Sequence, residues 1–202
     1  MLPAAAIALL AAATAAAAPP QPADAAPTGS LTFAIAPGST LAYRLGATFH
    51  EVRGVTHEVE GRARVLSDGT VQVMVRAPVA SFDSGNGNRD AHMKEVTDAA
   101  RFPFVVLKAV GSAPSLAGPA GTAVPAEPVR IALRGELIFH GVARPVEAPV
   151  EVRFAEGERA TARTTFPVSL TAHGVERPAL LFVKVDDRIE IEAGLALAPE
   201  VP

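Results

Sequence analysis

The stretch VTHEVEGRARVLSDGTVQVMVRAPV (Val55–Val79) decides the fold class of this chain. From Val55 to Val65 the odd positions are mostly apolar or small, and the even positions are mostly charged. Successive side chains of a β-strand point to opposite faces, so this pattern predicts a strand with one dry and one charged face. Asp68-Gly69 supplies a turn, and Val71–Val79 alternates again. The stretch therefore predicts an antiparallel hairpin of Val55–Val65 with Val71–Val79.

The same period of two extends over most of the chain on both sides of this hairpin. Further strands are predicted at Leu41–Phe49, Phe104–Val110, Val129–Phe139, Val146–Phe154, Thr161–Leu170, Ala179–Val185 and Arg188–Leu197. So many strands with one dry face each must either close on themselves or stack as two sheets. We predict an all-β protein, an antiparallel up-and-down barrel of about eight strands with one short helix. A two-sheet sandwich is the alternative.

The short helix is predicted at Arg89–Ala100. Asn88 is the expected cap, and Asp90 lies in the first turn, where the helix dipole favours a carboxylate. The predicted inward face of the barrel is mostly Val and Ala, with Gly61 and Gly135 among them. Small inward residues favour an open cavity over a filled interior, and an eight-stranded barrel is wide enough to hold one small ligand.

Composition limits the classes of function. The chain has 202 residues, of which 49% are apolar, with a net charge of -3 and no cysteine. The charge gives no sign of nucleic-acid binding, and the missing cysteines exclude disulfides, thiolate metal sites and a cysteine nucleophile. Residues 1–28 begin with an Ala-rich apolar run and continue into a Pro-rich segment, which predicts a signal peptide or disordered leader. The domain is then 29–202, periplasmic or secreted, without an integral membrane segment after cleavage.

Candidates for chemistry are sparse. The five histidines are scattered over separate elements, so no metal site is predicted. Ser81, His92 and Asp83 or Asp90 could form a triad on paper, but there is no Gly-x-Ser-x-Gly elbow. Gly85-Asn86-Gly87 lacks the Lys-Ser/Thr of a phosphate loop and is interpreted as a turn. We therefore predict no catalytic residue, no enzyme activity and no cofactor.

Two blocks of sequence together resemble the YceI-like family of exported bacterial proteins. The first block is Ser81–Asn86 followed by Arg89–Met93 and Phe102-Pro103, and the second is Leu133–Val146. The resemblance extends over roughly Leu41–Leu197. It implies a lipocalin-like barrel that holds a long apolar molecule, such as a polyisoprenoid or fatty-acid derivative, for binding, storage or transport in the periplasm.

The dry barrel face and this resemblance together define the candidate ligand-binding residues. Arg89 and His92 are expected to meet a polar head group. In the alternative, Arg89 and Asp90 tie the helix start to the barrel rim and His92 fills a polar pocket beneath it. The expected lining residues are Tyr43, Phe49, Val59, Val73, Val75, Leu133, Phe139, Phe166 and Phe182. A filled barrel acting as a structural or protein-binding module of the envelope remains the alternative. The oligomeric state stays open, with a homodimer as one option.

Overall fold

The computed structural model describes residues 31–47, 50–118, 125–155, 159–177 and 185–200. These residues contain nine strands and one α-helix, α1 (Gly87–Val96). The strands are β1 (Leu31–Ala47), β2 (His50–Thr56), β3 (Glu60–Val65), β4 (Thr70–Pro78), β5 (Phe104–Ser112), β6 (Val129–Phe139), β7 (Val142–Phe154), β8 (Ala160–Ser169) and β9 (Val185–Pro199).

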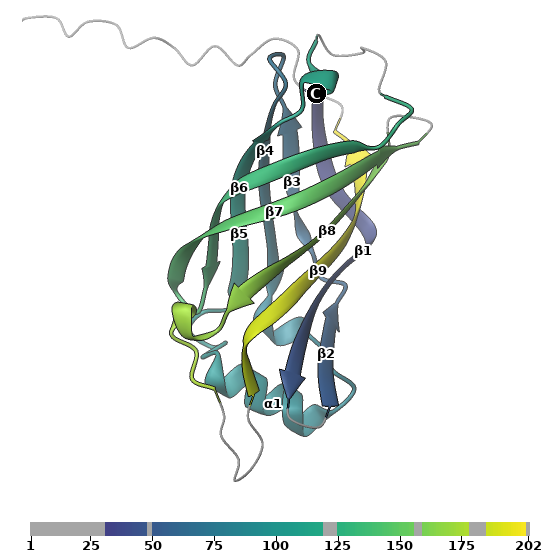
Figure 1. Ribbon diagram of the computed structural model, residues 1–202. Helices are drawn as coiled ribbons and strands as arrows, with labels where there is room; N and C mark the ends of the chain where they lie inside the picture. The colour runs from purple at the N-terminus through teal and green to yellow at the C-terminus, as the bar shows by residue number, and fades with distance from the viewer. Residues whose placement is uncertain (1–30, 48–49, 119–124, 156–158, 178–184, 201–202) are drawn as a thin grey trace, which may run out of the picture.

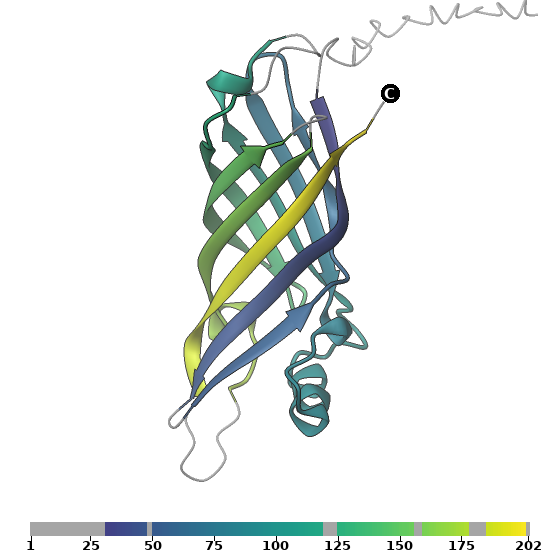
Figure 2. The same cartoon turned by 90° about the vertical axis from the view of Figure 1, so that its right-hand side faces the viewer.

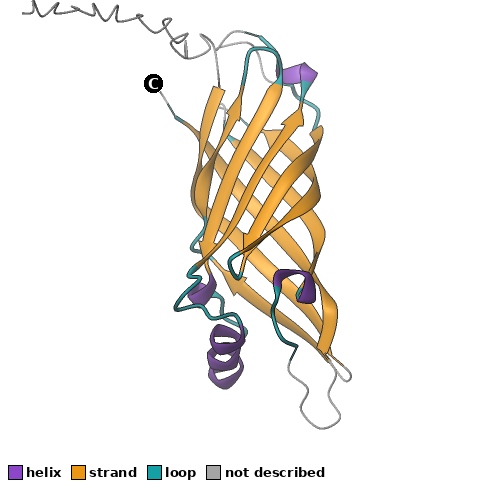
Figure 3. Cartoon of the chain, turned by 90° about the vertical axis from the view of Figure 1, so that its left-hand side faces the viewer, coloured by secondary structure: helices purple, strands orange, loops and turns teal. Residues whose placement is uncertain are grey.

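The strands form a closed antiparallel barrel with α1 at one end (Figures 1 and 3). Strands β3 to β9 pair in chain order, β1 pairs with β3, and β9 pairs back with β1 along most of its length. This gives an eight-stranded ring, and β2 adds a ninth strand beside the second half of β1. The predicted barrel is confirmed. The sandwich alternative is wrong, because the β1–β9 pairing closes the sheet.

A bulge lets β1 take two partners in succession. Its register against β9 shifts between Ala36 and Thr40, where Gly38 has a φ of 93°. The buried Ser39 hydroxyl donates to the Ala36 carbonyl at 2.8 Å and accepts from the Ala196 amide at 3.0 Å, which fixes the bulge. A bulge bends the strand that carries it. β1 therefore pairs with β3 before the bend and with β2 after it (Figure 2).

The predicted hairpin is confirmed in its second part and corrected in its first. β3 and β4 pair with Val65 opposite Val71, but Val55–Val65 is not one strand. β2 ends at Thr56, whose side chain is fully buried. The Thr56 hydroxyl accepts the Glu58 amide at 3.0 Å and lies 2.6 Å from the Ser81 hydroxyl. This turn ends the ladder, and β3 begins anew at Glu60.

The helix begins earlier than predicted. Its cap is Asn86, not Asn88, and the Asn86 side chain accepts the amides of Asn88 at 3.1 Å and Arg89 at 3.2 Å. Asp90 lies in the first turn as expected, and the helix ends at Val96. The cap moves because Gly85, with a φ of 76°, turns the chain directly before it. No helix among the described residues is long and apolar enough to cross a bilayer.

The two inward glycines do not create the expected space in the barrel. A Cβ on Gly135 would overlap the Lys108 carbonyl oxygen and lie 2.5 Å from the Cα of Ala109. A Cβ on Gly61 would overlap the Met74 carbonyl oxygen. Both glycines therefore let neighbouring strands approach closely, and neither widens the interior.

One end of the barrel is filled by apolar side chains. Phe33 and Val65 are buried there, together with Leu116 from the 3-10 helix η2 (Pro114–Leu116). The rings of Phe33 and Phe154 lie 6.2 Å apart between centroids. These residues pack as part of the buried core, at the end of the barrel opposite α1.

Candidate functional site: the barrel lumen

The barrel encloses a cavity of about 390 Å³, within the size range of small-molecule sites. On β9 its lining extends from Val185 to Leu197, and on β1 from Ile35 to Leu45. At about 3.3 Å per residue the β9 part is about 40 Å of strand, or about 30 Å along the axis at a tilt of about 40°. The cavity is therefore long and narrow. A filled barrel remained an alternative from the sequence, but the structure shows a barrel with a cavity.

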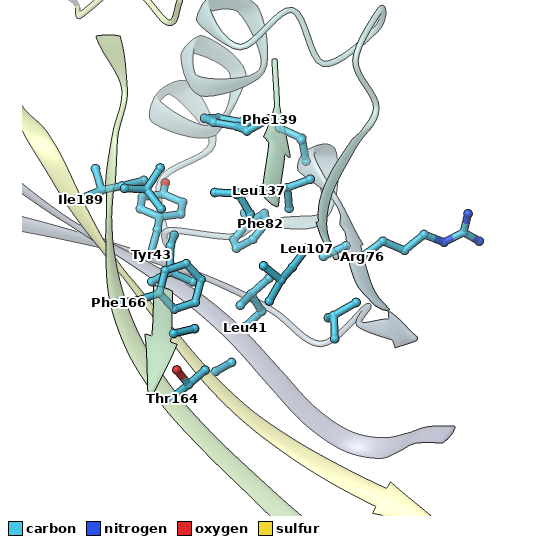
Figure 4. Close-up of a pocket in the computed structure, with 18 of the residues that line it drawn as sticks. Leu41, Tyr43, Arg76, Phe82, Leu107, Leu137, Phe139, Thr164, Phe166 and Ile189 are labelled. Atoms are coloured by element: carbon cyan, nitrogen blue, oxygen red, sulfur yellow. The ribbon is translucent and has the colours of Figure 1, made fainter. Parts of the chain in front are cut away.

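The wall of the cavity is almost entirely apolar. Arg62 and Arg76 line it only with their stems, because their guanidinium groups form ion pairs with Glu200 and Glu60 on the exterior. Figure 4 shows the Arg76 side chain pointing away from the cluster formed by the apolar residues. The half-buried Arg89 and the exposed His92 and Glu176 lie at the α1 end. The polar mouth of the cavity is therefore at α1, opposite the end that Phe33 and its neighbours fill.

Most of the predicted site residues gather around this cavity. Val59 is buried but does not belong to the lining, and Phe49 and Phe182 lie outside the described residues. Whether any of these residues contacts a ligand stays a prediction. The predicted residues that line the cavity are Tyr43, Val73, Val75, Arg89, His92, Leu133, Phe139 and Phe166.

Sequence reasoning missed other large side chains in the wall. Phe82 stands inside a polar motif, so no apolar period marked it, and Leu107 belongs to a strand with poor alternation. Figure 4 shows both side chains directed into the same space as Tyr43, Phe139 and Phe166. Phe82 had one available signal, because a lone aromatic residue in a polar loop commonly packs inward.

The polar motif folds as a self-contained loop around Asp90. The Ser84 hydroxyl and amide both donate to the buried Asp90 carboxylate. Arg89 Nε donates to the Ser84 hydroxyl at 2.9 Å, and Arg89 Nη2 donates to the Ser84 carbonyl at 3.1 Å. Ser84 thus joins the cation and the carboxylate, and the loop holds Arg89 at the mouth.

The start of the motif forms an isolated bridge with the free edge of β2. The Val55 amide donates to the Asp83 carbonyl and the Asp83 amide donates to the Val55 carbonyl, both at 2.9 Å. His92, by contrast, faces solvent with a side chain that is 47% exposed, and its Nδ1 lies 3.6 Å from Glu95. The motif is therefore largely structural, and it leaves Arg89 and His92 beside the opening.

Tyr43 reports on the lumen. Its ring packs against Phe82, with centroids 5.6 Å apart, and lies over its cross-strand neighbour Gly54. Burial raises the pKa of the Tyr43 phenol, the Asp90 charge raises it further, and the Arg89 charge opposes this. The chain has one tyrosine and no tryptophan. The tyrosine absorbance and fluorescence of the protein therefore come from a single residue, Tyr43, in the cavity wall.

A pH titration of the phenolate absorbance should give a midpoint above 10.0 in the folded protein and near 10 in urea. Because the folded pKa is the higher one, the contribution of Tyr43 to the free energy of unfolding is fully present below the unfolded pKa. It is lost as pH rises through the folded pKa. A native midpoint at or below that of the unfolded chain would contradict burial of Tyr43.

The Asp187 carboxylate stabilises the loop that follows β8, and this loop borders the cavity. Asp187 accepts the Ser169 hydroxyl at 2.7 Å and the Thr171 amide at 2.8 Å, at the start of the 3-10 helix η4 (Thr171–His173). These hydrogen bonds, the Ser169 hydroxyl first, lower the pKa of Asp187 to about 2. Leu170 and Val175 on either side of η4 line the lumen, so Asp187 supports one side of the mouth.

Nuclear magnetic resonance titration of the Asp187 carboxyl should give a midpoint of about 2, below the ordinary value of 3.8. A depressed folded pKa stabilises the protein above the unfolded value, and this contribution disappears as pH falls through about 2. Ser169→Ala should move the midpoint toward 3.8. An unchanged midpoint in that variant would show that the Ser169 hydroxyl is not the main cause.

Among the residues that the structure describes, no three His, Cys, Asp or Glu side chains are grouped closely enough to hold a metal ion.

The family follows from a comparison of the whole barrel sequence. The model of the YceI-like domain matches residues 32–197, which is most of the chain. The chain belongs to the YceI-like family. The resemblance predicted from the two sequence blocks is thereby confirmed. A search of curated proteins gave no match.

Solved structures share the YceI-like fold at low sequence identity. BcnA of Burkholderia cenocepacia is 19% identical with a TM-score of 0.61, over 78% of this chain and 95% of BcnA. A polyisoprenoid-binding domain of Saccharophagus degradans, implicated in plant cell wall breakdown, is 13% identical with a TM-score of 0.63, over 84% and 98%. The Campylobacter jejuni YceI protein is 14% identical with a TM-score of 0.58, over 77% and 88%. These likenesses show a common fold.

Proposed function

We propose that this protein binds one elongated apolar lipid, a polyisoprenoid or fatty-acid derivative, inside the barrel. The observation that carries the proposal is the long apolar cavity with a polar mouth at Arg89 and His92. Apolar walls favour a hydrocarbon chain because its transfer out of water is favourable and needs no directional partner. The polar groups at the mouth then face the head group.

The expected affinity is adequate for a carrier. Each buried methylene contributes about 0.8 kcal/mol, so ten of them give about 8 kcal/mol before losses. That corresponds to a dissociation constant of about 1 μM. A longer chain can offset the entropy that is lost when the lipid is ordered.

Two further lines support the ligand class and the location. The Saccharophagus degradans domain, which has the same fold, is described as polyisoprenoid-binding. The Ala-rich leader of residues 1–28 supports export, so we place the protein in the periplasm or outside the cell, where it stores or transports its lipid. Fractionation of cells that express the full chain tests this location, with a variant lacking the leader as the control.

Native mass spectrometry of gently purified protein is the direct test of binding. The expected result is a species heavier than the polypeptide, which releases a lipid on activation. Delipidated protein is then titrated with geranylgeraniol and with stearic acid while Tyr43 fluorescence is followed. A polypeptide of bare mass, together with no change in Tyr43 emission for either probe, would sink the proposal.

A further inference from the structure

One polar atom stands out in the apolar wall of the lumen. Thr164 on β8 lines the cavity, and its hydroxyl oxygen is buried without a hydrogen-bond partner in the structure. Its cross-strand neighbours are Val150 and Ala193, and the adjacent inward residues on β8 are Ala162 and Phe166. None of these four side chains can accept or donate a hydrogen bond. The neighbouring side chains of the wall therefore offer the Thr164 hydroxyl no hydrogen-bond partner.

Two other polar side chains of the lining do have hydrogen-bond partners. The Thr97 hydroxyl donates to the Met93 carbonyl at 2.7 Å, and Arg89 donates to Ser84. Buried polar groups are usually satisfied, and an unpaired one destabilises the fold. Valine has nearly the same shape as threonine and would fill this position without an unpaired group. The Thr164 hydroxyl therefore forms no hydrogen bond within the barrel that would explain a threonine at this position.

The position of Thr164 separates it from the mouth. It lies six residues before Leu170, where β8 has ended and η4 begins, which is about 20 Å of strand. Figure 4 shows Thr164 beyond Phe166, on the far side of the aromatic residues from the helix. Thr164 lines the lumen although its oxygen is buried, so the hydroxyl lies back against the wall. One rotation about χ1 to another staggered position would redirect it.

We propose that the lipid of this lumen carries a second hydrogen-bonding oxygen, a hydroxyl or a carbonyl, deep in its chain, and that Thr164 binds it. This inference rests on the proposed function and specifies its ligand class: an oxygenated lipid rather than a plain hydrocarbon tail. In pockets of this kind a few placed polar groups fix the orientation of the ligand. Thr164 would set how far the chain enters and which end leads.

Matched fatty acids test this directly. Delipidated protein is titrated with stearic acid and with hydroxystearic acids whose hydroxyl is moved along the chain, with Tyr43 fluorescence as the readout. A hydroxyl in the distal half of the chain should improve affinity about fivefold over stearic acid, the ratio expected from one net hydrogen bond. A hydroxyl beside the carboxylate should give no gain.

Two variants of Thr164 complete the design. Thr164→Val should bind stearic acid as the wild type does but lose the preference for the distal hydroxyl, whereas Thr164→Ser should keep it. Without ligand, Thr164→Val should melt at the same temperature as the wild type or higher, because it removes an unpaired group.

The outcomes separate the two proposals. Stearic acid that binds with no preference for any hydroxylated analogue would overturn this inference alone, as would a preference that survives in Thr164→Val. A lower melting temperature of Thr164→Val would also count against it, because the hydroxyl would then have a structural partner. Failure of every acid and of geranylgeraniol to bind would instead overturn the proposed function and this inference with it.

Discussion

Replacing Ala193 by phenylalanine is expected to weaken lipid binding about 100-fold while the barrel remains folded. Ala193 lines the lumen between Leu41 and Thr164, so a ring at this position would occupy the path of the chain. Losing about four buried methylenes from the complex removes about 3 kcal/mol. The new ring enters a cavity and not a packed core, so it should not force strands apart.

The matched control is Ala132→Phe. Ala132 is exposed on the outer face of β6, so the same change of side chain adds bulk outside the barrel. Titration of both variants with geranylgeraniol measures affinity, and thermal unfolding measures stability. Ala193→Phe protein that is folded and binds as tightly as Ala132→Phe would show that the chain does not occupy the lumen.

Substituting Gly135 by alanine is expected to destabilise the protein by about 3 kcal/mol, the upper part of the range for overpacking. The added Cβ would meet the backbone of Lys108 and Ala109 on β5, and not the tip of a flexible side chain. Backbone in a paired strand can yield only if the β5–β6 ladder separates, and Ala109 lies opposite Gly135 in that ladder. Urea unfolding followed by circular dichroism measures the change.

Gly87→Ala is the control for this prediction. A Cβ on Gly87 would meet nothing within 4 Å, and the residue begins α1. Its replacement should change stability by no more than about 0.5 kcal/mol. If Gly135→Ala were as stable as Gly87→Ala, the close approach of β5 and β6 would not exist in solution.

Alternation along the chain predicted the strands, because it reflects burial of one face, which is a local property of each strand. The same pattern failed at His57–Val59. There the strand is interrupted by the burial of Thr56 against Ser81, a contact between distant segments that no local period reveals. The glycine prediction failed for a similar reason. Gly61 and Gly135 are small to admit a neighbouring strand, and only the pairing shows which strand that is.

The lumen was partly predictable on the same grounds. Tyr43 and Phe166 occupy dry positions of alternating strands and do line the cavity, whereas Val59 follows the end of β2 and is buried elsewhere. Thr164 lies two residues before Phe166 in the predicted strand Thr161–Leu170, and therefore on the same face of that strand. That its hydroxyl lacks a partner depends on the residues across both neighbouring strands, which become known only with the register.

The pairing of β1 with β9 limits the routes by which a bound lipid could leave the barrel. The β1–β9 pairing closes the ring on that side, and apolar side chains that include Phe33 fill the end of the barrel opposite α1. A lipid chain bound in the lumen would therefore leave at the α1 end, where the mouth lies. The residence time of such a chain should then increase with its length, because each added carbon adds apolar contact that is lost on release.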